Sequence, residues 1–149
     1  SDSNFEVNSA ELSLEFSSML SDFYPRLMDV MFRYREAISE LRIEGHTDSS
    51  VGSADSELTG YLYNTQLSQN RSRNVMKYVL ELAPISDRKQ YLDWSFSHVT
   101  AHGMSSSKKV FDADGFENLA ASRRVEFRLR TTAEERLLDL VSEIKFNGN

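Results

Sequence analysis

Two charged residues in the middle of the chain could together recognise a small zwitterionic ligand. Asp48 follows the alternating segment 41–47, so its carboxylate would stand where a strand leaves the sheet. Arg71 lies four residues from both Leu67 and Val75, early in a predicted helix whose free N–H groups attract anions. The carboxylate could bind an ammonium group, while the guanidinium and the N–H groups could bind a carboxylate. The free end of an amino acid carries both groups.

Each of these residues also has an ordinary structural interpretation. Asp48 belongs to a Thr-Asp-Ser-Ser stretch, and such residues are common in turns because their side chains hydrogen-bond the nearby backbone. Arg71 could lay its apolar stem along the helix and keep its guanidinium in water. Neither residue alone indicates a site. The combination of an acid at a strand end with an arginine on the apolar stripe of a helix does.

The three histidines allow a different chemistry. His46 and Asp48 lie two residues apart beside one predicted strand, and His98 and His102 lie four apart on another, so each pair could share a face. Three imidazoles and a carboxylate would suit zinc, as in a metal-dependent hydrolase with one position open for water. This remains an alternative, because nothing in the sequence requires the two strands to be neighbours. A serine hydrolase is disfavoured because the sequence has no Gly-x-Ser-x-Gly motif.

The composition is that of one ordinary globular domain. Of the 149 residues, 40% are hydrophobic and 27% charged, enough to bury one core, and we expect a single domain over 1–149. The formal charge of −6 would repel a phosphate backbone, so we expect no nucleic acid partner. The absence of cysteine excludes disulfides and thiolate metal sites. No signal peptide or apolar run of about 20 residues is present, so we expect any membrane anchor to lie outside this sequence.

Periodicity predicts strands and helices that alternate along the chain. Apolar and polar residues alternate, as in strands, at 5–7, 41–47, 96–102 and 124–130. Apolar residues recur every three to four positions, as in helices, at 14–38, 67–82 and 132–146, and a short helix is expected at 87–93. This order predicts an α/β (α+β) two-layer sandwich, in which helices cover a mixed sheet.

Local signals mark the ends of some of these helices. Pro25 is expected to start or kink the first one, and Pro84 follows the second. Thr131 and Glu134 have the spacing of a capping box before the last helix. We expect the apolar faces of the first and last helices to pack on the domain core. A protein–protein interaction domain could instead use these faces to bind a partner or a second copy.

Three segments of the chain resemble the signature segments of OmpA-like (OmpA/MotB) C-terminal domains. The segments are Ile43-Glu-Gly-His-Thr-Asp48, Tyr63-Asn64-x-x-Leu67-Ser-x-x-Arg71 and Ser122-Arg-Arg-Val-Glu-Phe127. Each motif alone is weak, but the first two in this order and spacing are specific. The resemblance covers residues 43–127, and it implies a βαβαβ-αβ order with an N-terminal extension (1–40) and a C-terminal helix (about 132–146).

The resemblance implies non-covalent, non-enzymatic binding of bacterial peptidoglycan, without a cofactor or a metal. In that family the aspartate of the first motif and the arginine of the second contact diaminopimelate of the stem peptide. Those positions are Asp48 and Arg71 in this sequence. The neighbouring motif positions, which line or support the pocket, are Thr47, Tyr63, Asn64 and Leu67.

The chain departs from the family pattern in three places. The loop 49–62 is longer than the usual connection, Ser122 stands where asparagine is typical, and positions 118–119 are Asn-Leu where Gly-Arg is common. Arg123 and Arg124 remain available, but consecutive strand residues face opposite sides, so only one of them can point to the pocket rim. We expect Arg124 to be structural and Arg123 to lie nearer solvent.

The resemblance also implies a parent protein and a compartment. Domains of this family occur in porins, in lipoproteins and in the stator subunits of ion-driven motors. The region before the first motif and the enlarged loop favour a stator-type subunit, of the flagellar or the Zorya anti-phage type. We therefore expect a periplasmic domain of a membrane-anchored bacterial protein that anchors it to the cell wall, with a homodimer as an expected assembly.

Overall fold

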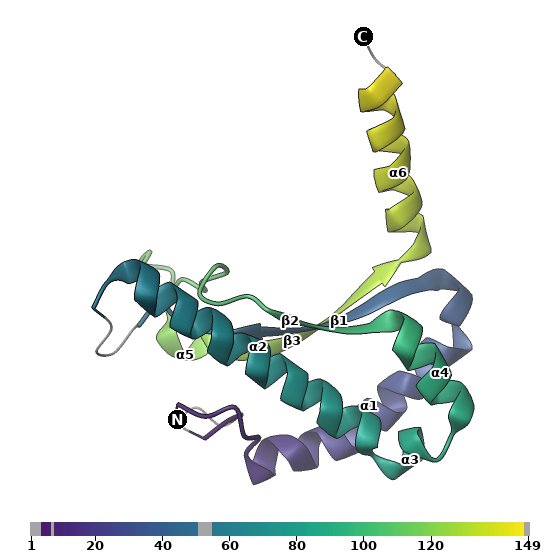
Figure 1. The fold of residues 1–149 in the computed structure, drawn as a ribbon, viewed down its shortest axis with the longest axis horizontal. Helices are drawn as coiled ribbons and strands as arrows, with labels where there is room; N and C mark the ends of the chain where they lie inside the picture. Colours follow the sequence, from purple (N-terminus) through teal and green to yellow (C-terminus); the bar gives the residue numbers. More distant parts are fainter. Residues whose placement is uncertain (1–3, 7, 51–54, 148–149) are drawn as a thin grey trace.

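The computed structural model describes residues 4–6, 8–50 and 55–147, the side chains of 145–147 excepted, and its centre is a three-stranded sheet in the order β2-β1-β3. Strand β1 (Ile38–His46) lies in the middle, parallel to β2 (Val99–Gly103) and antiparallel to β3 (Arg124–Thr131). The sheet is therefore mixed, as predicted (Figure 1).

The other regular elements of the described chain are helices. In chain order these elements are α1 (Leu14–Arg33), η1 (Arg35–Ala37), α2 (Glu57–Glu81), α3 (Ala83–Ser86), α4 (Lys89–His98), α5 (Leu119–Ser122) and α6 (Thr132–Asn147). The helices α1 and α2 pack with α3 and α4 against the apolar side of the sheet (Figure 1). The predicted α+β architecture, a mixed sheet covered by helices, is confirmed.

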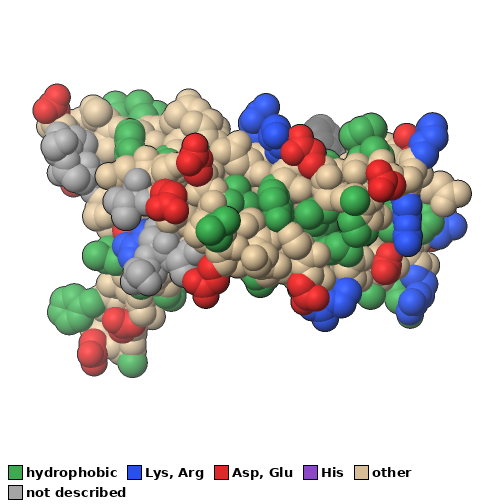
Figure 2. Space-filling model, turned by 90° about the horizontal axis from the view of Figure 1, so that it is seen from below, with side chains coloured by type: hydrophobic (Ala, Val, Ile, Leu, Met, Phe, Trp, Pro, Cys, Tyr) green, Lys and Arg blue, Asp and Glu red, His purple; other side chains and the backbone are tan. Residues whose placement is uncertain are grey.

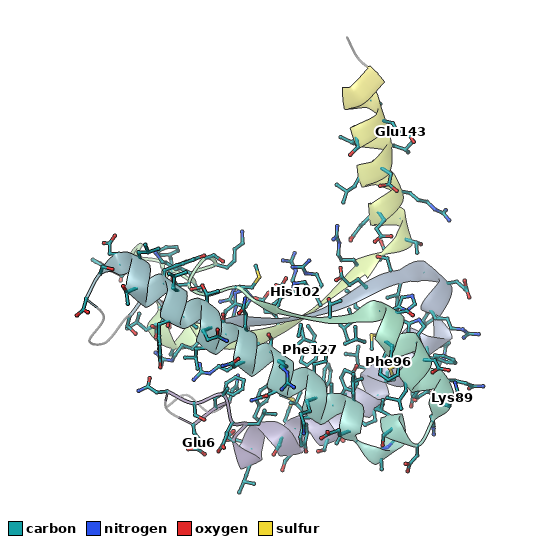
Figure 3. The ribbon with its side chains drawn as sticks, in the orientation of Figure 1. Glu6, Lys89, Phe96, His102, Phe127 and Glu143 are labelled. Carbon is teal, nitrogen blue, oxygen red and sulfur yellow. The ribbon has the colours of Figure 1, made fainter. Side chains whose placement is uncertain are left out.

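The two faces of the sheet differ because side chains alternate along each strand. Leu41 and Ile43 of β1 are fully buried on the helix side, where the ring of Phe127 of β3 packs at an angle against aromatic rings of α1. The other face carries charged residues and His102; in Figure 3 His102 and Phe127 lie on opposite sides of the sheet. The core under the sheet is completed by helix residues: Phe16, Leu20, Tyr24, Met28, Met31, Val75 and Val79.

The N-terminal part of the sheet differs from the prediction. Phe5 makes only an isolated antiparallel bridge with Leu12, so residues 5–7 do not form the expected first strand of the sheet in the described part of the chain. Val7 lies outside the described residues. Phe5 is nevertheless buried, and its ring packs edge-on against Phe16 at 5.6 Å between centroids. The segment is therefore tied to the helices rather than to a strand.

The first helix is shorter than predicted. The helix α1 begins after Ser13, whose side chain accepts a hydrogen bond from the N–H of Phe16, and ends at Arg33, so Ile38 starts β1 instead of ending the helix. Pro25 lies inside the helix and does not start it. Tyr24 and Met28 of this helix are fully buried, whereas Phe23 is 38% exposed, and apolar side chains gather on the underside of the molecule (Figure 2).

The second and third helical segments are longer than predicted. The helix α2 begins at Glu57, because Ser56 caps it by accepting a hydrogen bond from Thr59 N–H, so the polar residues before Leu67 are helical too. The predicted strand 96–102 begins only at Val99, because the residues before it complete α4. Residues 96–98 alternate in polarity but form the end of α4, because three alternating residues are too few to distinguish a strand from a helix end.

The last helix is placed correctly but does not join the core. The N–H of Glu134 donates to Thr131 Oγ1 at 3.2 Å and the N–H of Thr131 donates to the Glu134 carboxylate at 3.4 Å, which confirms the capping box. The helix then projects away from the sheet (Figure 1). The expectation that its apolar residues pack on the core is wrong, since all of these are exposed: Leu137, Leu138, Leu140, Val141 and Ile144. None of the described helices is long and apolar enough to cross a membrane.

Candidate functional site

Asp48 lies two residues after the end of β1, in a buried position with several hydrogen bonds. Its side chain accepts hydrogen bonds from the N–H and the hydroxyl of Ser50, the former at 2.8 Å, and from Arg123 Nη1 at 2.5 Å. The residue is 5% exposed, and its carbonyl accepts a hydrogen bond from Asn64 Nδ2 at 3.4 Å. The sequence-based placement at the exit of a strand is confirmed.

The surroundings of Asp48 keep its carboxylate ionised. Burial raises the pKa of this carboxyl, but the hydrogen bonds from Ser50 and Arg123 and the positive charge of Arg123 outweigh burial, and the net pKa lies below the usual value. A negative charge is therefore fixed beside the end of β1 at neutral pH. Such a charge can bind a ligand ammonium group. Arg123 would then have to share the Asp48 carboxylate with the ligand or release it.

Arg71 lies in the middle of α2 and not near its start, because the helix already begins at Glu57. The expected help from helix N–H groups is therefore wrong for this residue. Arg71 is 5% exposed; its Nε donates to the carbonyl of Ser9 at 2.8 Å, and its guanidinium carbon lies 4.7 Å above the centre of the Phe5 ring. The N-terminal segment thus packs on the arginine that the motif assigns to ligand binding.

Arg123 is the site residue that the sequence analysis placed differently. It was expected nearer solvent, but its guanidinium pairs with Asp48 and its side chain is only 29% exposed. Arg124 has the structural role expected of it, since it donates to Glu126 and to two backbone carbonyls. The pairing of His46 with Arg124 in the sheet explains the contact, because the residue before β3 then lies beside the residues that follow β1.

The other predicted site residues divide into a buried and an exposed group. Asn64 is buried and contacts Asp48, and Thr47 is buried with its N–H donating to the Ser105 carbonyl at 2.9 Å. Leu67 is half-buried, whereas Tyr63 is largely exposed. Asn64 and Thr47 thus support the position of Asp48, and Tyr63 is free to meet a ligand.

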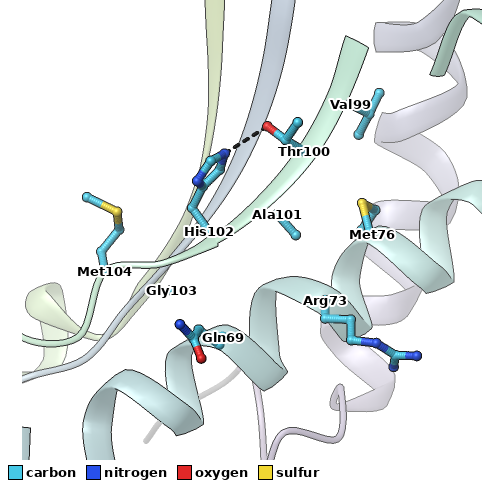
Figure 4. Close-up of a pocket in the computed structure, with 9 residues that line it drawn as sticks. All are labelled: Gln69, Arg73, Met76, Val99, Thr100, Ala101, His102, Gly103 and Met104. Carbon is cyan, nitrogen blue, oxygen red and sulfur yellow. Dashed lines mark hydrogen bonds between the residues drawn. The ribbon is translucent and has the colours of Figure 1, made fainter. Parts of the chain in front are cut away.

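The histidine-based alternative is not assembled in the structure. His98 Nδ1 donates to the carbonyl of Trp94 at 2.8 Å, and His102 Nε2 lies 2.8 Å from Thr100 Oγ1 in a groove of about 650 Å³ beside β2 (Figure 4). Asp48 is engaged elsewhere. His98, His102 and Asp48 therefore have separate partners, and the interpretation as a metal-dependent hydrolase gains no support.

A different group on the polar face of the sheet has the spacing of metal ligands. One ring nitrogen of His46 and carboxylate oxygens of Glu44 and Glu126 lie within 4.8 Å of one another. Both carboxylates already form ion pairs with guanidinium groups, which compensate the negative charge that a cation would need. The pairing arginines are Arg42 at 3.0 Å, Arg124 at 2.7 Å and Arg128 at 3.6 Å.

His46 is expected to make stability depend on pH. Burial lowers the pKa of its imidazole, and the positive charge of Arg124 lowers it further. Glu126 and Glu44 raise the pKa, but less, so the net pKa is lowered. With a folded pKa below the value of about 6.5 in the unfolded chain, the stability from neutral His46 is present above pH 6.5 and is lost as pH falls towards the folded pKa. The free energy of unfolding in urea should therefore decrease from about pH 7 to pH 5.5.

The control is His46→Gln, which removes the titrating group and should flatten this part of the pH profile. The pKa values of Asp48 and Glu126 are also lowered, but these two groups change the stability only below their ordinary pKa values of 3.8 and 4.5. They therefore do not affect the measurement between pH 7 and pH 5.5. Equal slopes in the variant and the parent would contradict the prediction.

Comparison with solved structures defines the class of the fold, although no family model matches the chain. A MotB-like protein from Desulfovibrio vulgaris superimposes with a TM-score of 0.56 at 28% identity, covering 87% of this chain and 68% of that chain. The cell wall anchor of the T6SS from Pseudomonas aeruginosa gives a TM-score of 0.52 at 25% identity, covering 87% and 76%. The fold and the motifs are those of an OmpA/MotB-like domain.

Within that class the sequence is similar to a particular protein. The Zorya protein ZorB of Escherichia coli (strain Crooks) is 37% identical over 139 residues, which cover 93% of this chain. The chain is thus a MotB/ZorB-like OmpA domain, and it spans 58% of the length of ZorB.

Proposed function

We propose that this domain binds peptidoglycan and anchors a larger protein to the cell wall, without catalysis. The observation that carries the proposal is the buried, ionised Asp48 at the end of β1, held by Arg123 and by Asn64 of the second motif. The similarity to ZorB and MotB-like proteins, and to a cell wall anchor, supports an anchoring role of the stator type. A periplasmic location follows from this role.

The ligand that we propose is diaminopimelate of the stem peptide. The fixed charge of Asp48 would bind its ammonium group, and the guanidinium of Arg71 would bind its carboxylate in a two-pronged contact. Thr47 and Asn64 would support the pocket, and Tyr63 and Leu67 would line it. Binding would require the N-terminal segment to share Arg71 with the ligand, because the Ser9 carbonyl already accepts a hydrogen bond from Nε.

The proposal is tested by cosedimentation with purified sacculi. The chain should sediment with sacculi that contain diaminopimelate, and free meso-diaminopimelate should release it in a concentration-dependent way. Sacculi with lysine at the same peptide position, which lack the second amino acid end, should retain much less protein. Equal retention on both kinds of sacculi would rule out diaminopimelate as the recognised group.

The whole-protein role is a further part of the proposal. We propose that residues 1–149 form one domain of a membrane-anchored, stator-type subunit, of the flagellar or Zorya anti-phage type. In such a subunit, binding to the wall would hold the torque-generating unit in place. This role is tested with the full-length protein. Loss of wall binding should abolish its motor-dependent function and leave its membrane insertion unchanged.

A homodimer is proposed through the exposed helix α6. Leu137, Val141 and Ile144 recur at the three-to-four spacing of a helix-pairing seam, with Leu140 beside them, and the same face on a second copy would cover them symmetrically. Light scattering should give twice the chain mass, and Val141→Glu should give the monomer mass. A wild-type monomer at high micromolar concentration would contradict this assembly.

A further inference from the structure

A small hairpin, residues 110–118, presents two exposed phenylalanines near the proposed site. Its strands are joined by the bridge between Phe111 and Glu117, and the N–H of Asp112 donates to the carbonyl of Phe116 at 2.8 Å. Gly115 turns the chain with φ +84°, a conformation that glycine favours. Phe111 is 59% exposed and Phe116 is 74% exposed.

The register of the hairpin gives its two aromatic rings opposite directions. Side chains of bridge partners point to the same side, so Phe111 and Glu117 share one face. Phe116 precedes Glu117 directly, and consecutive residues of an extended strand alternate, so its ring points to the other face. The hairpin thus offers one ring on the side of Glu117 and one ring on the far side.

The face with Glu117 is the one that adjoins the site. The Glu117 carboxylate accepts hydrogen bonds from the N–H of Ser49, at 3.0 Å, and from its hydroxyl. Ser49 follows Asp48 directly, so the hairpin face that carries Glu117 and Phe111 is joined to the residue next to the proposed ammonium-binding carboxylate. The base of the hairpin is fixed as well, because the N–H of Val110 donates to the buried Ser122 Oγ at 3.0 Å.

The charge of the hairpin indicates which chemistry its exposed ring would accept. Residues 108–118 carry three acids, of which Glu117 shares the face of Phe111, and two lysines, Lys108 and Lys109, so no strong charge of either sign favours anionic lipid headgroups or the carboxylates of a peptide. A neutral sugar ring suits this surface, because its apolar C–H face carries partial positive charge and the face of an aromatic ring is negative. Apolar and acidic side chains also share a projection at the left end of Figure 2, the end where α5 lies in Figure 1.

We propose that Phe111 is a stacking platform for an N-acetylhexosamine ring of the glycan strand next to the bound stem peptide. This inference rests on the proposed function, since it takes the peptide to lie at Asp48. It extends recognition from the peptide to the sugar, so a wall fragment with both parts would bind more tightly than the peptide alone.

The test compares two ligands and two matched variants by calorimetry. The ligands are the disaccharide-tripeptide of peptidoglycan and the corresponding free tripeptide with diaminopimelate at its end. Phe111→Ala should weaken binding of the disaccharide-tripeptide roughly 5- to 10-fold and leave the tripeptide unchanged. Phe116→Ala, which removes a still more exposed ring from the opposite face, should change neither, and Phe111→Trp should preserve sugar-dependent binding. Thermal unfolding of each variant should match the parent.

Each other outcome has a definite meaning. Equal losses for both ligands in Phe111→Ala would make Phe111 a peptide contact and overturn the sugar assignment, as would equal effects of the two alanine variants. A parent chain that binds the disaccharide-tripeptide through Phe111 but not the free tripeptide would support the platform and contradict the proposed peptide site. A chain that binds neither ligand would overturn both.

Discussion

Arg71→Ala is expected to weaken binding of a diaminopimelate-containing tripeptide about 30-fold or more, which corresponds to about 2 kcal/mol. The reason is that a buried guanidinium is the group best suited to a two-pronged contact with the ligand carboxylate, and no other charged residue of α2 in the second motif can replace it. Calorimetric titration of the tripeptide measures the change directly. Arg71→Lys, which keeps the charge but loses the planar fork, should give an intermediate loss.

The difficulty with this variant is that Arg71 also holds the N-terminal segment, through the Ser9 carbonyl and the Phe5 ring. A matched control removes a second tether of the same segment without removing charge: Asn74 Nδ2 donates to the Ala10 carbonyl at 2.9 Å. Asn74→Ala should loosen the segment and leave the tripeptide affinity within about twofold, a few tenths of a kcal/mol. If Asn74→Ala weakened binding as much as Arg71→Ala, the arginine would act only by positioning the segment.

Asp48→Asn separates the other half of the proposed contact. The side chain keeps its shape and its oxygen for Ser50, but the charge that would bind the ligand ammonium is gone and Arg123 loses its ionic partner. Binding of the tripeptide should fall as strongly as in Arg71→Ala. A ligand whose ammonium group is acetylated should bind the parent and Asp48→Asn equally weakly, and a clear preference for the parent would contradict the assigned contact.

The sequence predicted those parts of the fold and the site that depend on local pattern. Alternation from Leu41 to Thr47 located β1 and therefore the place of Asp48, and the same pattern located β3. The spacing of Thr131 and Glu134 located the start of α6. These features depend on contacts between residues near in the chain, so the amino acids themselves specify them.

The parts that were missed depend on contacts between distant segments. Nothing near Arg123 in the sequence indicates that it pairs with Asp48, although the antiparallel register of His46 with Arg124 would have predicted it once the strands were paired. The contact between Arg71 and Ser9 joins residues 62 positions apart. The exposure of α6 was misjudged because an apolar stripe predicts that a face will be covered and does not identify what covers it.

Gly45→Ala is expected to destabilise the domain by about 2 to 3 kcal/mol, the cost of forcing a methyl group into a packed interface. Gly45 lies in β1 under α2, and a Cβ atom there would stand 2.5 Å from the Ser68 carbonyl oxygen and 3.3 Å from its carbonyl carbon. Both are backbone atoms, so relief requires α2 to move as a unit. Ser68 Oγ also accepts from the N–H of Ser105 at 3.0 Å, and this bond resists such a movement.

The same movement would displace Asn64 from Asp48, because Asn64 and Ser68 lie one turn apart on α2, so Gly45→Ala should also weaken tripeptide binding. Urea unfolding measures the first effect and calorimetry the second. Gly115→Ala is the control: its φ of +84° makes alanine unfavourable by about 1 kcal/mol, but nothing lies within 4 Å of the added methyl group. A loss in Gly45→Ala no larger than in Gly115→Ala would mean that α2 can shift freely on the sheet, and the rigid support proposed for the Asp48 site would then be absent.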